Sequence, residues 1–358
     1  MRIAFYGSSL LSSYWNGAAT YYRGLLRDLA RRGHHITFFE PDAFDRQFHR
    51  DMEPPDWAAV QVWPATETGA RSAIAQAAAA DVGVFDDLLL EGVMAAARPH
   101  AIRIFWDVDA PATLAELRAA GPTHPLRRLV PSLDFVLTYG GGPPVVAAYE
   151  EFGARRCVPI YNALDPATHH SVAPEPRFEA DLAFLGNRLP DREARVEEFL
   201  FHPATLLPRR RFLIGGNGWD SRALPANVVR LGHVYTREHN AFNSTPLAVL
   251  NIARDSMAAV GFSPATRVFE AAGAGACLIT DAWEGLELFL KPEEEVLVAR
   301  NGTEVAAQLS ALTPARSRAV GAAARARILA QHTYARRGAA VDALLQEEHA
   351  RRRKRSVA

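Results

Sequence analysis

The chain has little of what marks several protein classes, beginning with cysteine. Its 358 residues include only two cysteines, Cys157 and Cys277, too few for a disulfide framework or a cysteine-rich zinc site. Both lie in apolar stretches, which is typical of buried, reduced thiols. Neither sign of charge is in excess, because 40 Lys and Arg residues balance 40 Asp and Glu residues. A nucleic-acid-binding protein needs a basic surplus to neutralise phosphates, so the composition argues against one.

Long apolar runs and targeting patterns are also missing. No stretch approaches the roughly 18 apolar residues that a membrane-spanning helix needs. The first residues lack the long apolar segment and cleavage site of a signal peptide. We therefore expect no transmembrane segment and a cytoplasmic location. The basic run at 351–355 is expected to be a solvated, frayed tail, with weak contact to anionic lipid or to a partner as the alternative.

The order of apolar segments predicts two α/β domains. A strand at 2–6, a helix at about 18–32 and a strand at 36–39 form a βαβ unit, which implies a parallel sheet. Strands and helices alternate onwards, and the pattern restarts near residue 181. The predicted parts are an N-terminal Rossmann-like domain at 1–163, a linker at 164–180, a C-terminal Rossmann-like domain at 181–335, and a helix with a basic tail at 336–358. His169 and His170 fall in this linker, where solvated positions are expected.

Parallel sheets bind ligands beyond the carboxyl ends of their strands, so the residues that follow the predicted strands are the candidates for a site. The glycine fingerprint of dinucleotide-binding proteins is missing, which disfavours a nicotinamide-dependent dehydrogenase. Asn16 and Gly17 precede the first helix, and open N–H groups there suit an anion or acceptor as well as a simple turn. Asp107 and Asp109 follow the strand at 102–106. They suit sugar hydroxyls or a catalytic base, with a turn or helix cap as the alternative and no metal expected.

The second half of the chain offers a first phosphate loop. Gly186, Asn187 and Arg188 follow the strand at 181–185. Glycine lets a ligand approach the backbone closely, and an arginine can bind phosphate with two N–H groups. The alternative is a surface arginine after a turn.

The most informative stretch runs from 247 to 284. Asn251 and Arg254 lie at and after a strand end, and a turn follows with Ser263 and Pro264. A helix beginning near residue 266 would direct its N-terminal dipole at a pyrophosphate. Arg254 and Arg267 would add charge-assisted hydrogen bonds, and Glu270, one turn further on, suits two ribose hydroxyls.

This stretch resembles a known family. The segments VLNIARDSMAAVGFSPATRVFEAAGAGACLITDAWEGLELF and LGHVYTREHNAFNSTPLAVLNIAR are similar to the CgeB-like glycosyltransferases. IFWDVDAPATL, DLAFLGNRLPDREARVEEF and ILAQHTYARRGAAVDALL also look like that family. The resemblance implies the GT-B fold, in which two Rossmann-like domains with parallel sheets face an interdomain cleft. The donor nucleotide would lie mainly on the C-terminal domain, and the last helix would pack back on the N-terminal one.

The resemblance also implies roles for individual residues. Glu270 stands where related transferases bind the donor ribose, and Arg188, Arg254 and Arg267 would hold the diphosphate. The nucleobase would be flanked by a four-residue loop: Gly232, His233, Val234 and Tyr235. One departure is Phe262, which stands where the wider superfamily often has a second glutamate that contacts the donor sugar.

The implied activity is transfer of a hexosyl group from a nucleotide-diphosphate sugar, with retention as in the nearest GT-B relatives. The resemblance implies no metal and no cofactor, and leaving-group charge would be stabilised by arginines and a helix N-terminus. The acceptor, whether glycan, protein or small molecule, is not indicated. Two alternatives stay open: a sugar-nucleotide epimerase of the same fold, and a non-catalytic nucleotide-sugar or carbohydrate-binding protein.

Overall fold

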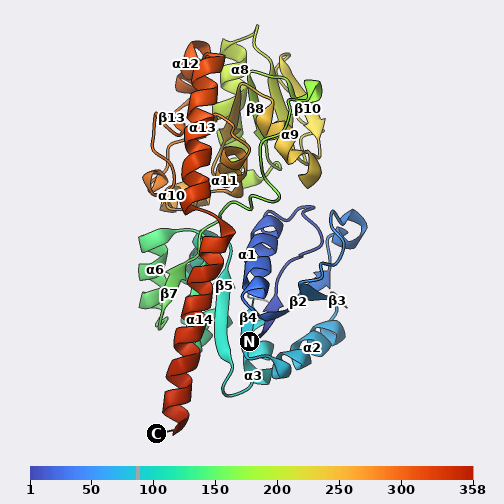
Figure 1. Cartoon of the computed structure of the whole chain (residues 1–358), viewed down its shortest axis with the longest axis vertical. Coiled ribbons are helices and arrows are strands. Elements are labelled where there is room, and N and C mark those ends of the chain that lie inside the picture. The colour runs from blue at the N-terminus through green and yellow to red at the C-terminus, as the bar shows by residue number, and fades with distance from the viewer. Residues whose placement is uncertain (86–88, 358) are drawn as a thin grey trace. The chain divides into compact units, whose positions relative to one another are not determined.

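The computed structural model describes residues 1–85 and 89–357 and divides the chain into two compact units (Figure 1). The first unit consists of Met1–Tyr161 and Tyr334–Ala358, and the second of Asn162–Thr333. The last residue of the predicted 336–358 segment lies outside the described residues.

The first unit is built on a seven-stranded parallel sheet in the order β3-β2-β1-β4-β5-β6-β7. Its central strands are buried on both faces, as the side chains of β6 show, because helices cover a parallel sheet on both sides. The strands are β1 (Arg2–Tyr6), β2 (His35–Asp42), β3 (Ala58–Pro64), β4 (Val82–Phe85), β5 (Ile102–Asp107), β6 (Phe135–Thr138) and β7 (Cys157–Pro159). The helices are α1 (Ala19–Arg31), α2 (Glu67–Ala75), α3 (Leu90–Ala96), α4 (Ala110–Ala120), α5 (Pro125–Leu129), α6 (Gly142–Glu151) and α14 (Tyr334–Val357).

The second unit is built on a six-stranded parallel sheet in the order β10-β9-β8-β11-β12-β13. Buried side chains of β8, β9 and β11 form its core with Trp219 and Val305. The strands are β8 (Leu182–Leu185), β9 (Phe212–Gly215), β10 (Val228–Gly232), β11 (Ala248–Asn251), β12 (Leu278–Asp281) and β13 (Leu297–Ala299). The helices are α7 (Pro190–Val196), α8 (His202–Leu206), α9 (His239–Ser244), α10 (Asp255–Val260), α11 (Thr266–Gly273), α12 (Gly302–Ala311) and α13 (Pro314–Gln331).

The fold class predicted from the sequence is confirmed, whereas several elements differ from the prediction. Strands β3 and β7 were not predicted, because β3 is largely exposed along one edge of the sheet and β7 has only three residues. Helix α7 ends at Val196 and continues as one π-helical turn, Glu197–Phe201.

Residues 164–180, expected to be a linker, belong instead to the second unit. Leu164 forms a parallel bridge with Thr333, and Phe178 is fully buried against Phe242. The segment is irregular in structure but well packed, because its apolar side chains find partners in this unit.

The basic run at 351–355, expected to be a frayed tail, continues α14 as helix. Arg352 is held there by an ion pair with Asp134 (2.5 Å) and a hydrogen bond to the carbonyl oxygen of Ala101 (3.0 Å). The side chain of Arg355 lies outside the described part of the structure.

Helix α14 packs closely against α1 within the first unit. A Cβ atom added at Gly24 of α1 would lie 2.1 Å from Cδ2 of the buried Tyr334. We expect Gly24→Ala to lower the free energy of unfolding by about 1 to 3 kcal/mol through overpacking, measured by urea denaturation. Gly17→Ala is the matched control, because an added Cβ there meets nothing within 4 Å. Equal stability of the two variants would contradict this packing.

Both cysteines are free and buried, as expected. Burial raises the pKa of each thiol to about 12, so neither is a nucleophile near neutral pH. Among the described residues, no helix combines the length and the apolar character needed to cross a membrane.

Candidate functional site

The loops at the carboxyl edge of the second unit's sheet are hydrogen-bonded to one another. The amide of Gly186, after β8, donates to the carbonyl oxygen of Gly215 at 3.0 Å. The amide of Gly216 donates to the carbonyl oxygen of Gly232, at the end of β10, at 2.8 Å. Gly216 has φ +112°, and a Cβ there would lie only 2.3 Å from the carbonyl oxygen of Gly186. A glycine is therefore required for this close approach of two loops.

Helix α11 positions an acidic and a basic side chain at the same edge. Glu270 is 3% exposed, and its Oε2 lies 3.5 Å from Nη1 of Arg267, one turn earlier. Burial lowers the pKa of Arg267, and the neighbouring Glu270 opposes that shift. Arg267 also contacts Oδ1 of Asn243 at 3.4 Å. The carboxylate is thus held in a nearly water-free environment beside a cation.

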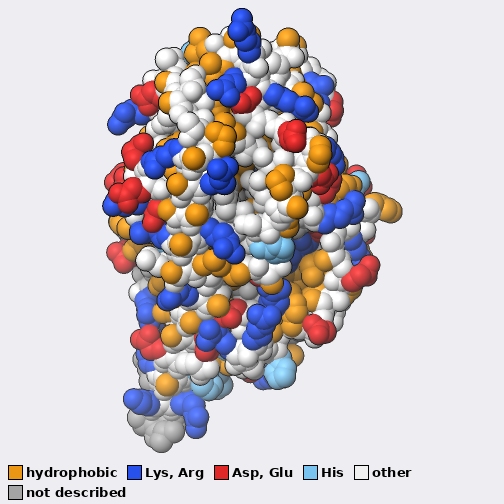
Figure 2. All heavy atoms as spheres, turned by 45° about the horizontal axis from the view of Figure 1, so that its top comes forward, with side chains coloured by type: hydrophobic (Ala, Val, Ile, Leu, Met, Phe, Trp, Pro, Cys, Tyr) orange, Lys and Arg blue, Asp and Glu red, His pale blue; other side chains and the backbone are white. Residues whose placement is uncertain are grey.

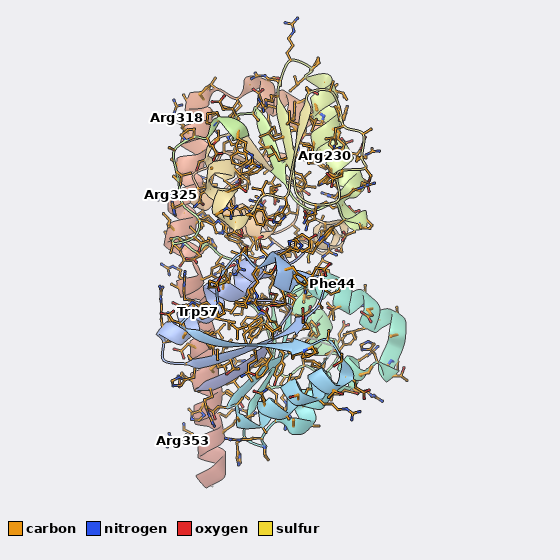
Figure 3. The ribbon with its side chains drawn as sticks, turned by 90° about the vertical axis from the view of Figure 1, so that its right-hand side faces the viewer. Phe44, Trp57, Arg230, Arg318, Arg325 and Arg353 are labelled. Atoms are coloured by element: carbon orange, nitrogen blue, oxygen red, sulfur yellow. The ribbon has the colours of Figure 1, made fainter. Side chains whose placement is uncertain are left out.

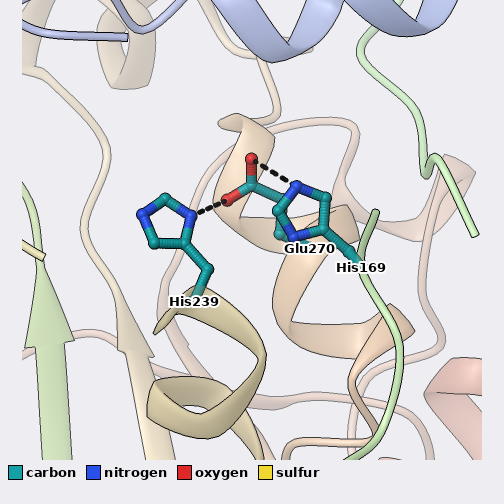
Figure 4. Close-up of side chains that lie close together, drawn as sticks. All are labelled: His169, His239 and Glu270. Atoms are coloured by element: carbon teal, nitrogen blue, oxygen red, sulfur yellow. Dashed lines mark ion pairs between the residues drawn. The ribbon is translucent and has the colours of Figure 1, made fainter. Parts of the chain in front are cut away.

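Two histidines complete this cluster (Figure 4). Nε2 of His169 lies 3.6 Å from Oε1 of Glu270, and Nδ1 of His239 lies 3.9 Å from Oε2. The expectation that His169 is solvated is wrong, because the segment carrying it packs into the second unit and leaves it 1% exposed. His239 lies at the start of α9, just after the loop from Gly232 to Tyr235.

Both imidazoles are held neutral near pH 7. Burial lowers the pKa of His239 to about 4 and also lowers that of His169, although Glu270 acts in the opposite direction on each. The Nε2 atom of His239 lies 3.2 Å from the carbonyl oxygen of Val234, so the N–H of this ring is assigned to Nε2. This hydrogen bond ties the predicted nucleobase loop to the helix pair that carries the cluster.

Metal binding is the first chemistry to test at this cluster. Its three potential ligand atoms lie within 4.8 Å of one another, the one such group found among the described residues. Two features oppose a cation. The guanidinium of Arg267 lies beside Glu270, and neither ring nitrogen of His169 has the hydrogen-bond partner that usually orients a metal-bound histidine. The donor set therefore fits a metal poorly.

The other two predicted phosphate arginines each pair with a carboxylate. Arg188 donates to Oε1 of Glu193 at 2.7 Å, and Nε of Arg254 donates to Oδ2 of Asp191 at 2.6 Å. Both arginines are partly exposed, so an anion can compete for them without a large loss of packing.

Arg192 is a basic residue that the sequence analysis missed. It lies in the first turn of α7, donates to the carbonyl oxygen of Asn187, and has a buried Nε without a hydrogen-bond partner. Burial lowers the pKa of its guanidinium to about 10; Asp191 raises it, whereas Arg254 and Arg267 lower it further. The guanidinium groups of Arg254 and Arg267 therefore lie near enough to Arg192 to influence its charge. Pro190, a residue favoured in a first helical turn, was the available signal for a helix start here.

The remaining predicted donor residues line the same strand ends and mostly make structural contacts. Asn187 Oδ1 accepts from the amide of Asn217, and Asn251 Nδ2 donates to Thr280 Oγ1. Ser263 donates to the carbonyl oxygen of Gly261, and the carbonyl oxygen of Pro264 accepts from Asn162. In the nucleobase loop, Val234 is buried and the rings of His233 and Tyr235 meet edge to face at 4.4 Å.

Phe262 has a strained backbone. Its φ of +49° lies in the left-handed region, which is unusual for a bulky side chain. Its amide donates to the carbonyl oxygen of Glu284 at 2.6 Å, and its ring lies so close to Gly285 that a Cβ there would be 2.3 Å away. The loop before α11 is thus held in one conformation by its neighbours.

In the first unit, the contacts of Asp107 favour a structural role. Its carboxylate accepts from the amide of Asp109 (3.0 Å), Thr113 Oγ1 (3.0 Å) and the hydroxyl of Tyr149 (2.5 Å). Burial raises its pKa to about 6, against the opposing effect of the Tyr149 hydrogen bond. These bonds fasten the start of α4 to the end of β5. Asp109 immediately precedes that helix, and its carbonyl oxygen accepts from the amide of Thr113.

Asn16 also makes contacts within its own loop. Its Nδ2 donates to the carbonyl oxygens of Ser9 and Ser12, and its Oδ1 accepts from Ser8. Gly17 is exposed beside it. The structure therefore supports the turn-forming alternative for Asn16 more directly than anion binding.

Comparisons with known proteins agree with this architecture. Residues 192–346 match the family described as glycosyl transferase-like. No curated protein sequence matches the chain. The structure of a sucrose-phosphate synthase from Thermosynechococcus elongatus superposes with a TM-score of 0.71 at 14% identity, covering 98% of this chain and 99% of that one.

Two further structures have the same fold. Anabaena HepE in complex with UDP and glucose gives a TM-score of 0.68 at 13% identity, covering 97% of this chain and all (100%) of the other. Phage T4 BGT in complex with UDP-glucose gives a TM-score of 0.60 at 12% identity, covering 96% of this chain and 99% of the other. The two parallel-sheet units therefore have the GT-B fold found in these structures, and the glycosyl transferase-like match covers residues 192–346.

Proposed function

We propose that this protein is a glycosyltransferase that moves a hexosyl group from a nucleotide-diphosphate sugar to an acceptor, with retention and without a metal ion. The observation that carries the proposal is the pairing of buried Glu270 with Arg267 in the first turns of α11, at the carboxyl edge of a parallel sheet. The GT-B fold and the glycosyl transferase-like match at 192–346 support it. The proposal also places this protein in the CgeB-like subfamily of glycosyltransferases.

In this proposal, three groups of residues bind the ribose, the base and the diphosphate of the donor. Glu270 accepts hydrogen bonds from the two ribose hydroxyls, and the loop from Gly232 to Tyr235 flanks the base. Arg188, Arg254 and Arg267 bind the diphosphate, and we add Arg192 to them because its buried Nε lacks a partner. The structures of HepE and BGT contain UDP or UDP-glucose, so a uridine donor is the first to test.

The chemistry follows from where charge develops. As the glycosidic bond to the diphosphate breaks, negative charge grows on the leaving oxygen, and preorganised guanidinium groups stabilise it. Binding of the diphosphate replaces Glu193 and Asp191 as partners of Arg188 and Arg254. Since both ion pairs are partly exposed, their exchange costs little.

A thermal-shift panel of UDP, GDP, dTDP, ADP and CMP sugars tests the donor site. A ligand at 100 times its Kd should add about 2.7 kcal/mol to the free energy of unfolding. We expect one nucleotide class to raise Tm, equally with and without EDTA. A shift abolished by EDTA would overturn the metal-free mechanism, and the absence of any shift would overturn the donor site.

Product analysis with the stabilising donor then separates the reaction types. A new glycoside supports the transferase, and its anomeric configuration tests retention. An isomerised sugar nucleotide would identify an epimerase instead. Binding without turnover would favour a non-catalytic binding protein, the alternative suggested by Phe262 in place of a carboxylate.

A further inference from the structure

A shallow basic pocket of about 380 Å³ lies on the first unit, at the amino ends of its strands and thus at the opposite edge from the ligand-binding edge of that sheet. Its charged lining comes from the start of β5, from residues just before β6 and β7, and from the end of α14. These lining residues are His100, Arg103, Asp134, Arg155, Arg351 and Arg352. Neither the proposed donor site nor the predicted loop at Asn16 and Gly17 uses any of them.

The pocket retains positive charge after its internal pairs are made. Nη2 of Arg352 lies 2.5 Å from Asp134 Oδ1, and Nη1 of Arg155 lies 3.7 Å from the same atom. Arg351 and Arg352 share the carboxylate of Glu348 at 2.7 and 2.8 Å. Arg103, which also lines the pocket, adds a fourth guanidinium group to these three, and four guanidinium groups against two carboxylates leave two positive charges for a further anion.

One of these arginines also has an unused hydrogen-bond donor. Nε of Arg103 is buried and has no hydrogen-bond partner. A buried donor without a partner is unfavourable, and such groups usually find an acceptor from protein, water or ligand. A phosphate oxygen in the pocket is an acceptor of the right charge.

The basic surface continues beyond the pocket along α14. Arg353 and Lys354 are exposed on its last turns, and Figures 2 and 3 show basic side chains beside this end of the helix. A single soluble phosphate needs only the pocket. A surface that presents many phosphates would engage both the pocket and the end of the helix.

We propose that the pocket and the basic end of α14 dock the first unit on an anionic phospholipid surface, with one headgroup phosphate in the pocket. Clusters of basic residues bind such surfaces through the negative charge of the headgroups, and each basic residue raises the affinity about fivefold. A lipid surface is favoured over nucleic acid because the chain as a whole has no basic surplus. This inference goes beyond the proposed function and does not depend on it.

Vesicle co-sedimentation of the full chain tests the proposal. We expect binding to vesicles of equimolar phosphatidylcholine and phosphatidylglycerol, no binding to phosphatidylcholine alone, and weaker binding as salt rises. The double variant Arg155→Gln/Arg351→Gln should bind roughly thirtyfold more weakly. Both side chains are about half exposed, at 55% and 48%, so this variant should fold. Arg353→Gln/Lys354→Gln should lose affinity similarly.

The matched control is Arg318→Gln/Arg336→Gln, which removes two exposed arginines of α13 and α14 outside the pocket. It should bind like the unchanged protein. Equal loss in the control, or no binding to anionic vesicles, would overturn the proposal. Stabilisation by pyrophosphate without vesicle binding would also overturn it, in favour of a soluble phosphate ligand. Binding of duplex DNA in place of vesicles would have the same consequence.

Discussion

Replacing Glu270 with glutamine should weaken binding of the donor nucleotide by about 1 to 3 kcal/mol, or roughly 5- to 150-fold in Kd. The carboxylate is 3% exposed, so hydrogen bonds from ribose hydroxyls would form away from competing water. An amide keeps the shape but has one acceptor oxygen in place of two. Isothermal titration of the nucleotide identified by the thermal-shift panel measures the effect.

The matched control is Glu287→Gln, which neutralises an exposed carboxylate of the same unit. It should leave Kd unchanged. A 2′-deoxynucleotide should bind the unchanged protein more weakly and lose less affinity on Glu270→Gln, since one of the two hydroxyls is already absent. An unchanged Kd in a folded Glu270→Gln variant would remove the ribose assignment.

Arg267→Met should lower the free energy of unfolding by roughly 3 kcal/mol, because it leaves Glu270 buried without its cation. Only 13% of the Arg267 side chain and 4% of that of Glu270 are exposed, so water replaces little of the lost interaction. Burial lowers the pKa of both neighbouring histidines, so in the unchanged protein Arg267 is the cation beside Glu270 near pH 7. Urea denaturation with and without the substitution measures the loss.

A second substitution decides whether the ion pair is the cause. Arg267→Met/Glu270→Leu should recover most of the stability lost in Arg267→Met, because removing both charges leaves no buried ion unpaired. Strictly additive losses in the two single variants and the double variant would show that packing, rather than charge, dominates. Donor affinity should stay low in all three variants, which separates the stability effect from the binding effect.

For several residues of the candidate site in the second unit, local sequence was enough to predict the element that carries them. Arg254 and Arg267 were predicted because each follows a strand end or begins a helix, and local sequence determines both features. Glu270 was selected by its spacing from that helix start and by its apolar neighbours, and the structure buries it as this pattern indicated. Its role at the ribose stays a prediction.

Other parts of the site depend on contacts that local sequence does not encode. His169 lies in a segment without helical or strand periodicity, and it reaches Glu270, 101 positions away, only through packing. The neutral state of His239 depends on burial by distant elements. For Asp107, local sequence was misleading in the opposite sense. Its position after β5 suggested a catalytic role, whereas the hydrogen bond that it accepts from Tyr149 on α6 favours a structural role.

Sequence alone determined the two α/β units, their parallel sheets and the loops at the carboxyl edge of the second sheet, because alternating apolar segments and turn residues act over short distances. Tertiary structure decided the rest. It assigned 164–180 to the second unit, brought two neutral histidines to Glu270, and joined the end of α14 to the basic pocket. Burial and charge depend on residues far apart in the chain, so these properties arise only when the units fold.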